Sequence, residues 1–276
     1  MKIGEALAVA GLDRRELRLM LAEASGLSEA QLLAYPEREL AAGAAVKFGL
    51  WVARREAGEP LAYLIGWREF FSLKLAVSPA VLIPRPETEL LVELALGRLP
   101  AAEGASVLDL GTGSGAIALA IKANRPHARV LAVDASGAAL QIAQSNAKRL
   151  RIAVDFREGS WFAPLPGERF HLVVSNPPYV AEGDPHLGLG DLPNEPQLAL
   201  IAGVDGLQAL REIVEGAPYH LRDGGWLLLE HGYDQAEQVR AMLDRSFFEE
   251  ISTWPDPAGI ARVTGGRYNP DKFTQV

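Results

Sequence analysis

A glycine-rich turn between a strand and a helix constrains the fold of this chain more than any other feature. Residues 107–110 form an apolar run typical of a buried strand, and they lead directly into Gly111-Thr112-Gly113-Ser114-Gly115 and then into the helical pattern of residues 116–120. Glycines in such a turn let a ligand approach the backbone closely. The pattern indicates a nucleotide-type site, although an isolated match is about as often a plain tight turn.

Strand and helix patterns alternate after residue 86. A helix is expected near 87–98, and strands are expected near 107–110, 129–133, 153–157, 171–175 and 226–230, with residues 247–253 and 262–264 as candidates for two final strands. This alternation predicts an α/β fold with a Rossmann-like, mostly parallel sheet that is covered on both faces. Ligands of such sheets bind at the carboxyl ends of the strands.

The first part of the chain has a different pattern. Residues 3–66 read as short helices, with the capping-box spacing at Asp13 with Glu16 and at Ser28 with Gln31. Between residues 70 and 82 the apolar period shifts toward two, which favours a hairpin or an extended linker. We therefore expect a helical domain over 1–69, a hairpin or linker over 70–86 and a larger domain over 87–276.

Composition excludes several classes of protein. The 276 residues are 49% hydrophobic and contain no cysteine, which excludes disulfides, thiolate zinc sites and cysteine nucleophiles. The net charge is −8 without a basic run, so no direct contact with nucleic acid is expected. The histidines lack metal-ligand spacing, and we expect no metal. No signal peptide or membrane-length apolar run is evident, so a cytoplasmic protein is expected.

An acidic residue follows the second strand of the larger domain. Asp134 stands where a carboxylate can accept hydrogen bonds from both hydroxyls of a ribose lying across the strand ends. Dinucleotide and S-adenosylmethionine folds share this arrangement. The third glycine of the turn comes one residue early for the dinucleotide pattern, which favours S-adenosylmethionine.

A rigid polar corner follows the predicted strand over 171–175. The sequence there is Asn176-Pro177-Pro178-Tyr179, on the same sheet edge as the glycine turn. The prolines lack N–H donors, so the Asn176 side-chain oxygen and the Pro177 carbonyl can both act as acceptors for an NH₂ group. Two acceptors would orient a planar amide or amino nitrogen for methylation, while Tyr179 offers a face for stacking. A packed, strand-ending turn is the alternative interpretation.

These motifs leave three functions open. The first is methylation of an amide nitrogen, and the second is methylation of an exocyclic amino group of adenine or guanine in DNA or RNA. The third is a non-catalytic binding module or a nucleotide-dependent oxidoreductase. The acidic balance of the chain argues against a nucleic-acid substrate.

With both motifs in view, the chain resembles the HemK/PrmC family, the glutamine N5-methyltransferases that modify the Gly-Gly-Gln motif of peptide chain release factors. Further segments carry the resemblance: 60–63 with Gly66, 82–89, and 181–187. The resemblance implies a class I methyltransferase with a seven-stranded sheet, S-adenosylmethionine as donor, S-adenosylhomocysteine as product and release factors as protein substrates. It also implies that the helical domain docks the substrate.

The resemblance also implies roles for individual residues. Those expected to contact the donor are Gly111, Thr112, Gly113, Ser114, Gly115, Asp134, Trp161 and Asn176, and those expected to hold the substrate glutamine are Asn176, Pro177, Pro178 and Tyr179, with Arg85 and Glu87 lining the site. Residues 85–89 also read as a simple helix start, and Trp161 as a core residue. The chain departs from the family pattern at Ser160 and over 192–196, which puts adenine anchoring and one substrate contact in question.

Overall fold

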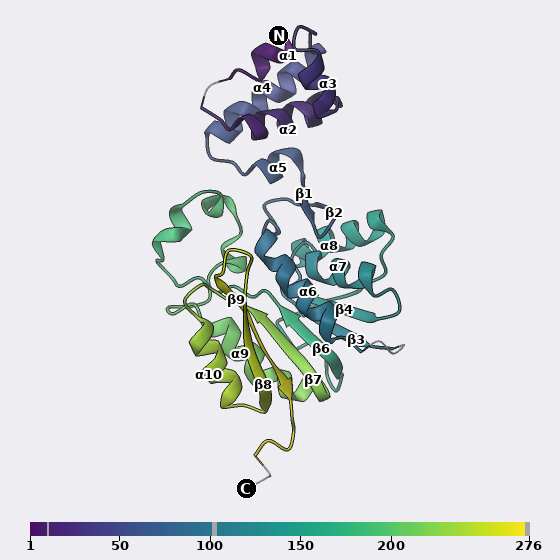
Figure 1. Ribbon diagram of the computed structural model, residues 1–276, viewed down its shortest axis with the longest axis vertical. Coiled ribbons are helices and arrows are strands. Elements are labelled where there is room, and N and C mark those ends of the chain that lie inside the picture. Colours follow the sequence, from purple (N-terminus) through teal and green to yellow (C-terminus); the bar gives the residue numbers. More distant parts are fainter. Residues whose placement is uncertain (10, 101–103, 274–276) are drawn as a thin grey trace. The chain divides into compact units, whose positions relative to one another are not determined.

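The computed structural model describes residues 1–9, 11–100 and 104–273. It divides into two compact units (Figure 1). The first comprises Met1–Trp67 with Gly188–Asn194, and the second comprises Arg68–Leu187 with Glu195–Val276. No helix among the described residues is both long and apolar enough to cross a membrane.

The first unit is a small bundle of helices around an apolar core. Leu17, Met20 and Leu21 on one helix face Phe48 and Trp51 on another, and all five are buried. Leu17, Met20 and Leu21 recur at helical spacing, which explains why one face of their helix is covered. The helices are α1 (Ile3–Ala6), α2 (Arg14–Ser25), α3 (Glu29–Ala34), α4 (Ala42–Glu56) and α5 (Leu61–Ile65).

The two predicted capping boxes have different outcomes. Ser28 forms the full reciprocal box with Gln31 at the start of α3. Asp13 caps α2 by accepting from the Arg15 backbone N–H at 2.6 Å, but the expected return bond from Glu16 is absent among the hydrogen bonds of the described residues. The Glu16 carboxylate instead binds the Arg55 guanidinium through two bonds of 3.0 Å. A bidentate ion pair competes successfully with the local cap.

A short segment from the second half of the chain belongs to the first unit. Residues 188–194, which include η3 (Leu192–Asn194), bind α4 and the residues after it. The Asp191 carboxylate lies 3.1 Å from the Arg55 guanidinium, and the Asn194 amide donates to the Gly58 carbonyl at 3.0 Å. The loop that follows the Asn-Pro-Pro-Tyr corner is therefore shared between the two units.

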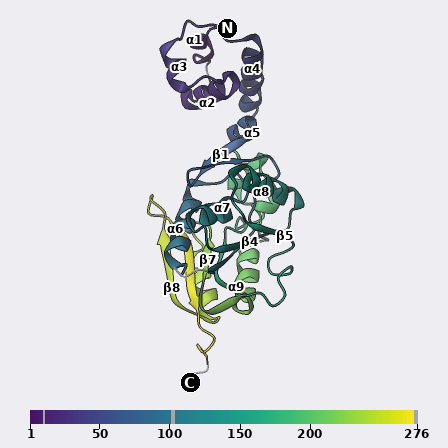
Figure 2. The ribbon, with the colours of Figure 1, turned by 90° about the vertical axis from the view of Figure 1, so that its right-hand side faces the viewer.

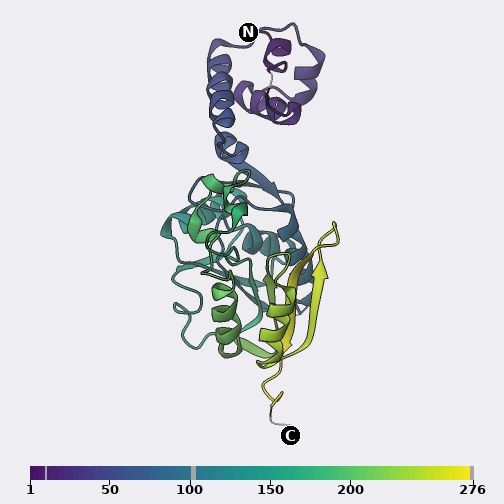
Figure 3. The ribbon, with the colours of Figure 1, turned by 90° about the vertical axis from the view of Figure 1, so that its left-hand side faces the viewer.

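The second unit is built on a seven-stranded sheet with the order β5-β4-β3-β6-β7-β9-β8. The first five strands in this order are parallel, whereas β9 runs antiparallel between β7 and β8. Figure 3 shows the last two strands, in yellow, at the edge of the sheet. The strands are β3 (Ser106–Leu110), β4 (Arg129–Asp134), β5 (Asp155–Glu158), β6 (Phe170–Ser175), β7 (Leu221–Glu230), β8 (Phe248–Pro255) and β9 (Ala261–Tyr268). All seven expected strands are present, and the predicted fold class is confirmed.

Helices cover both faces of this sheet (Figure 1). One face carries α6 (Glu89–Arg98), α7 (Ala116–Asn124) and α8 (Gly137–Leu150), which lie toward the viewer in Figure 2. The other carries α9 (Gln208–His220) and α10 (Ala236–Asp244). Short 3₁₀ turns are η1 (Pro86–Thr88), η2 (Pro185–Gly188) and η4 (Gln197–Ala199).

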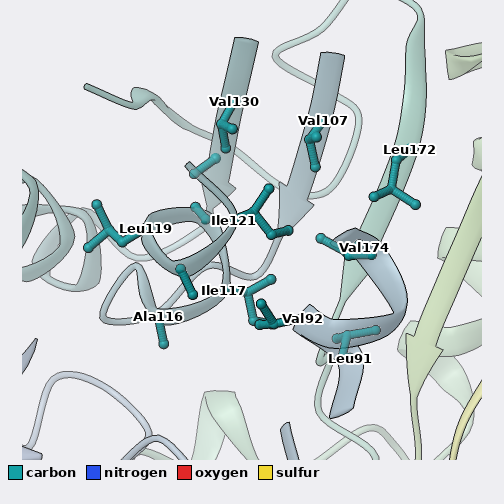
Figure 4. Close-up of a cluster of buried hydrophobic side chains, with 14 of the residues drawn as sticks. Leu91, Val92, Val107, Ala116, Ile117, Leu119, Ile121, Val130, Leu172 and Val174 are labelled. Atoms are coloured by element: carbon teal, nitrogen blue, oxygen red, sulfur yellow. The ribbon is translucent and has the colours of Figure 1, made fainter. Parts of the chain in front are cut away.

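Strand alternation divides the core between the two faces. Val107 and Val130 pack with Ile117 and Ile121 of α7 and with Val92 of α6 (Figure 4). Their strand neighbours face the other way and pack against α9 and α10; these include Leu108, Leu131 and Val173. Because successive residues of a strand point to opposite faces, strands buried on both sides must be apolar throughout, as these are.

A separate hairpin precedes the sheet. It consists of β1 (Trp67–Phe70) and β2 (Leu73–Ala76). Asn146 of α8 is fully buried and connects this hairpin to the glycine turn: its oxygen accepts from the Ala76 N–H at 2.7 Å, and its NH₂ group donates to the carbonyls of Ala76 at 3.0 Å and Ser114 at 2.9 Å. One side chain therefore satisfies three backbone groups, two of Ala76 at the end of β2 and one of Ser114 in the glycine turn.

Asn146→Ala should be strongly destabilising. The substitution leaves three backbone groups without their partner in a buried place, and we expect the free energy of unfolding to fall by about 3 kcal/mol. Urea denaturation followed by circular dichroism would measure this change. Asn124→Ala is the matched control, because Asn124 is exposed and its amide donates only to the Ala120 carbonyl of its own helix. Equal losses in the two variants would contradict the assignment.

Candidate active site

The five parallel strands bring their following residues to one edge of the sheet. Beside them lies a cavity of about 340 Å³. Since β3 pairs with β4 on one side and with β6 on the other, the cavity lies at the point where the strand order reverses. The predicted residues that line it are Arg85, Gly111, Thr112, Gly113, Ser114, Asp134, Trp161, Asn176 and Pro178, whereas Glu87, Gly115, Pro177 and Tyr179 are not among the lining residues.

The glycine turn is held against the end of β4. The backbone N–H groups of Gly111 and Thr112 both donate to the Val133 carbonyl, at 2.9 and 3.0 Å. Gly113 has φ = +56°, and no atom lies within 4 Å of the place where a side chain would begin, so its backbone is open to the cavity. Gly115 has a different role: a Cβ there would lie 3.2 Å from the Ala143 Cβ, which shows that α8 packs directly on it.

Asp134 ends β4 beside the turn. Its carboxylate accepts from the Gly113 N–H at 2.8 Å and from the Ser136 N–H at 2.9 Å. Burial raises the pKa of this carboxyl, and the two backbone hydrogen bonds lower it in part. Each carboxylate oxygen keeps a further lone pair, so Asp134 can still accept hydrogen bonds from a ligand.

Trp161 lies over the glycine turn and is half-buried. A Cβ on Gly111 would be 3.5 Å from its ring. The indole N–H donates to the Glu212 carboxylate of α9 at 2.8 Å, and Glu212 also accepts from Gln208 at 3.1 Å. Trp161 has φ = +44°, which is unusual for a residue with a side chain and indicates that surrounding contacts hold it. It packs partly on the core and partly lines the cavity, while its predicted contact with the donor stays a prediction.

Asn176 follows β6, with its side-chain NH₂ group donating to the Thr88 hydroxyl oxygen at 3.1 Å. The preceding residue, Ser175, is buried and donates to the Leu110 carbonyl at 2.7 Å, which connects the ends of β6 and β3. The bond to Thr88 uses the nitrogen of the Asn176 amide. Its Oδ1 oxygen is therefore the acceptor that Asn176 can present to a ligand.

Tyr179 packs against the apolar core beneath α9, and its hydroxyl lies 3.5 Å from the Glu230 carboxylate. Its backbone carbonyl accepts from Gln235 at 2.9 Å. Burial, and then the charge of Glu230, raise the pKa of the phenol. Tyr179 is therefore held as a neutral phenol by contacts behind the cavity.

The segment 85–89 begins α6 and also contributes to the cavity. Pro86 occupies the first position of η1, as the simple helix-start interpretation predicts. Arg85 and Thr88 nevertheless line the cavity. Arg85 forms an ion pair with Glu195, whose side chain is fully buried and also accepts from the Ile83 N–H at 3.0 Å. The segment 192–196, where the sequence departs from the family pattern, thus supplies Glu195, an acid that holds Arg85 in place.

A buried carboxyl supports the glycine turn from beneath. Asp109 of β3 is completely buried, and one of its oxygens accepts from the Thr112 hydroxyl at 2.6 Å and from the Ala118 N–H at 3.2 Å. The other oxygen has no hydrogen-bond partner among the described residues. Burial raises the pKa of Asp109 to about 7, which the two hydrogen bonds oppose.

The sequence analysis gives no individual role to four polar residues at this edge: Thr88, Asp109, Glu212 and Glu230. Two of them carry a usable signal, because Glu230 ends an apolar strand as Asp134 does, and Asp109 is an acid within an apolar run. Thr88 lies in a segment that was singled out as a whole. Glu212 carries no sequence signal for such a role, since an acid on the polar side of a helix is ordinary.

Asp109 should make stability fall as pH rises. Its folded pKa of about 7 is above the ordinary 3.8, so its contribution to stability is fully present below pH 4 and is lost as pH rises through 7. Asp109→Asn removes this loss of unfolding free energy, which amounts to up to about 1.4 kcal/mol per pH unit. Urea unfolding at pH 5, 6, 7 and 8 should show the variant gaining on the wild type as pH rises.

The control for this prediction is Asp155→Asn, an exposed acid at the start of β5. It should track the wild type at every pH. A constant difference between Asp109→Asn and the wild type over this range would show that Asp109 does not titrate there.

The fold is that of the class I methyltransferases. Two solved structures share it: the hMettl16 catalytic domain, with a TM-score of 0.57 and 15% identity over 82% of this chain and 81% of that one, and a T. thermophilus 16S rRNA methyltransferase, with a TM-score of 0.55 and 21% identity over 74% and 50%. At these identities the similarity defines the fold alone. A family model described as "Methyltransferase small domain" matches residues 87–190.

Within that class, the chain belongs to the release factor glutamine methyltransferase family. The relative from Burkholderia pseudomallei is 50% identical over 270 residues, which cover 95% of both chains. The relative from Xylella fastidiosa is 51% identical over 263 residues, covering 95% and 96%, and that from Neisseria gonorrhoeae is 46% identical over 270 residues, covering 97% and 98%. Residues 2–66 match a model described as "PrmC N-terminal domain". The resemblance seen in the sequence is confirmed.

Proposed function

We propose that this protein transfers a methyl group from S-adenosylmethionine to the side-chain amide nitrogen N5 of the glutamine in the Gly-Gly-Gln motif of peptide chain release factors. The observation that carries the proposal is the orientation of Asn176, whose amide nitrogen binds Thr88 and whose oxygen remains for an NH₂ group. Family membership selects a protein glutamine among the groups that carry NH₂.

The glycine turn fits the donor. Gly113 has open space where any other residue would have a side chain, and Asp134 stands beside it with acceptor capacity for ribose hydroxyls. Trp161 adds a half-buried aromatic surface over Gly111. We assign the donor to the cavity-lining members Gly111, Thr112, Gly113, Ser114, Asp134, Trp161 and Asn176, with Gly115 holding the turn against α8.

When bound, S-adenosylmethionine supplies an electrophilic methyl group on a positively charged sulfur. The residues of this chain then have mainly to position the acceptor nitrogen, which is a weak nucleophile because its lone pair is delocalised into the amide. Asn176 Oδ1 and the Pro177 carbonyl would accept its two hydrogens and aim it. The nitrogen would gain the methyl group and release one hydrogen as a proton to solvent, and the donor would leave as neutral S-adenosylhomocysteine, so the product is again a neutral amide.

The remaining predicted residues have supporting roles in this proposal. Pro178 lines the cavity and fixes the backbone of the corner. Tyr179, held by Glu230 and by the core, would offer one face to the planar amide. Arg85, fixed by Glu195, lines the cavity, while Glu87 acts at a distance through its charge on Glu230.

The helical unit is proposed to dock the release factor. Val46 and Leu50 are 64% and 61% exposed on α4, and their i, i+4 spacing places them on one face of the helix. Exposed apolar side chains grouped on one face commonly mark a protein interface.

Incubation with labelled S-adenosylmethionine and a purified release factor should label one glutamine, which peptide mass spectrometry would locate. A Gln-to-Glu form of the release factor should remain unlabelled, since sites built for an NH group discriminate by up to about 10⁴ to 10⁵. Asn176→Ala should lower turnover by about 10² to 10³. Label in DNA or RNA in place of the release factor would instead support a nucleobase amino group as the acceptor.

Donor binding gives a separate test. At 100 times its dissociation constant, S-adenosylhomocysteine should add about 2.7 kcal/mol to the free energy of unfolding and so raise the melting temperature. NAD should leave the melting temperature unchanged.

Glu212→Gln removes the charged acceptor that holds the Trp161 indole. We expect the dissociation constant for S-adenosylhomocysteine to rise about tenfold in this variant.

Glu215→Gln is the matched control for this measurement, because it removes an exposed acid from the same helix without touching Trp161. Isothermal titration would measure both variants. Stabilisation by NAD, or equal affinities in Glu212→Gln and the wild type, would refute the assigned donor site.

A further inference from the structure

The backbone of the Asn-Pro-Pro-Tyr corner has to be held at its two ends. Its prolines have no N–H to donate, and in the proposed mechanism the Pro177 carbonyl is reserved for the substrate. The near end is fixed by Ser175, whose hydroxyl donates to the Leu110 carbonyl at 2.7 Å. The far end is the backbone carbonyl of Tyr179, which accepts from the side chain of Gln235. The direction of the acceptors therefore depends on Gln235 as well.

Gln235 is a buried residue of the loop between β7 and α10. Its Nε2 donates to the Tyr179 carbonyl at 2.9 Å and to the Gly206 carbonyl at 3.3 Å, and its Oε1 accepts from the Gly232 N–H at 2.8 Å. These partners are backbone groups, each of which can only accept or only donate. The amide of Gln235 therefore has one possible orientation, in which it joins the corner to the turn before α9 and to the loop after β7.

Gly206 contacts the same carbonyl from the turn before α9. It has φ = +71°, and a Cβ at this position would lie 2.5 Å from the Tyr179 carbonyl oxygen and 2.9 Å from Gln235 Nε2. Both distances are far inside van der Waals contact, so glycine alone leaves the corner in its place. The next residue of the chain is bound to the same segment, because the Val180 N–H donates to the Leu200 carbonyl at 2.8 Å. The end of the corner thus packs closely on residues 200–206.

Gln235 lies behind the cavity. Neither Gln235 nor Gly206 is among the residues that line it, whereas Asn176 of the corner is. Without the bond from Gln235, the peptide that follows Tyr179 is free to rotate. Such a rotation is passed back along the chain to the Pro177 carbonyl, which lies two residues earlier. The consequence is a change in the direction of the acceptors that leaves the glycine turn untouched.

We infer that Gln235 is a positioning residue for methyl transfer: by holding the Tyr179 carbonyl against Gly206, it directs the acceptors of the corner at the substrate nitrogen. The inference rests on the proposed function and adds to it a residue that touches neither substrate nor donor. It assigns separate tasks to two parts of the site, because the glycine turn binds the donor and Gln235 sets the direction of the acceptors.

Gln235→Glu keeps the shape of the side chain and replaces the Nε2 donor by an oxygen, which would face two carbonyl oxygens. We expect kcat on the release factor to fall about 10- to 100-fold, since a misplacement of about 1 Å in an active site can cost about 100-fold. The dissociation constant of S-adenosylhomocysteine and the KM for the release factor should be unchanged. Initial rates with labelled donor and isothermal titration would measure these quantities.

Gln238→Glu is the matched control, because it makes the same change of charge at an exposed glutamine of α10. It should leave kcat unchanged. A wild-type kcat in Gln235→Glu would overturn the inference. Equal losses of kcat and of S-adenosylhomocysteine affinity in Gln235→Glu would overturn it too, because Gln235 would then support the whole cavity instead of the corner.

Gly206→Ala tests the same contact without altering the Gln235 side chain. The new methyl group must displace the Tyr179 carbonyl, so kcat should fall while the donor affinity is unchanged. Gly167→Ala is its control: Gly167 has φ = +74°, close to that of Gly206, but no atom lies within 4 Å of the place of its Cβ. Both variants bear the cost of a positive φ, and of the two only Gly206→Ala displaces the corner. Equal kcat in the two would contradict the inference, even where Gln235→Glu does not fold.

A readout that needs no substrate separates this inference from the proposed function. Hydrogen–deuterium exchange followed by mass spectrometry should be faster over residues 179–182 in Gln235→Glu and in Gly206→Ala, because the Val180 N–H is less firmly bound. Residues 111–115 should exchange as in the wild type. Unchanged exchange over 179–182 would overturn the inference. Faster exchange in a protein that does not methylate release factors would leave Gln235 as the residue that holds the corner and refute only the function.

Discussion

The parallel arrangement of five strands is the constraint on which the central part of the site depends. Neighbouring parallel strands end at the same edge, so whatever residue follows each strand is brought to one place regardless of its distance in the sequence. Gly111, Asp134, Trp161 and Asn176 reach the cavity in this way. The antiparallel β9 lies on the far side of β7 and supplies Arg262, whose charge acts on Glu230 from behind the site.

Buried acids give this edge its rigidity at a cost in stability. Asp109 holds the glycine turn and Glu230 lies behind the Asn-Pro-Pro-Tyr corner, and burial raises the pKa of both to about 7. In each, one oxygen has no partner among the described residues. Groups with such perturbed pKa values concentrate at functional sites, because function keeps them where stability would remove them. The positive φ of Trp161 is a further local cost at the same edge.

The parts of the structure that could be predicted from the sequence are those written in local patterns. Apolar strands, the glycine turn and the residues at strand ends follow from period and position, which is why the sequence predicts that Gly113, Asp134 and Asn176 lie together at one edge of the sheet. The role of Asn146 could not be predicted, because it depends on hydrogen bonds to the Ala76 and Ser114 backbones, which are 70 and 32 residues away in the sequence. The Glu16 cap failed for the same reason: a distant arginine, Arg55, offered a stronger partner.

The orientation of a side chain is a further step removed from sequence. Asn176 can be named as a ligand from its place after β6, but an amide offers an acceptor on one side and donors on the other, and no local pattern says which side faces the ligand. In this structure the Asn176 nitrogen donates to the Thr88 hydroxyl, 88 residues earlier, and the oxygen is left for a ligand. An NH₂ group and a carboxylate differ only in which partner they need. A site that must tell them apart therefore depends on a contact that holds the amide in one orientation, and the Thr88 hydroxyl of η1 makes that contact.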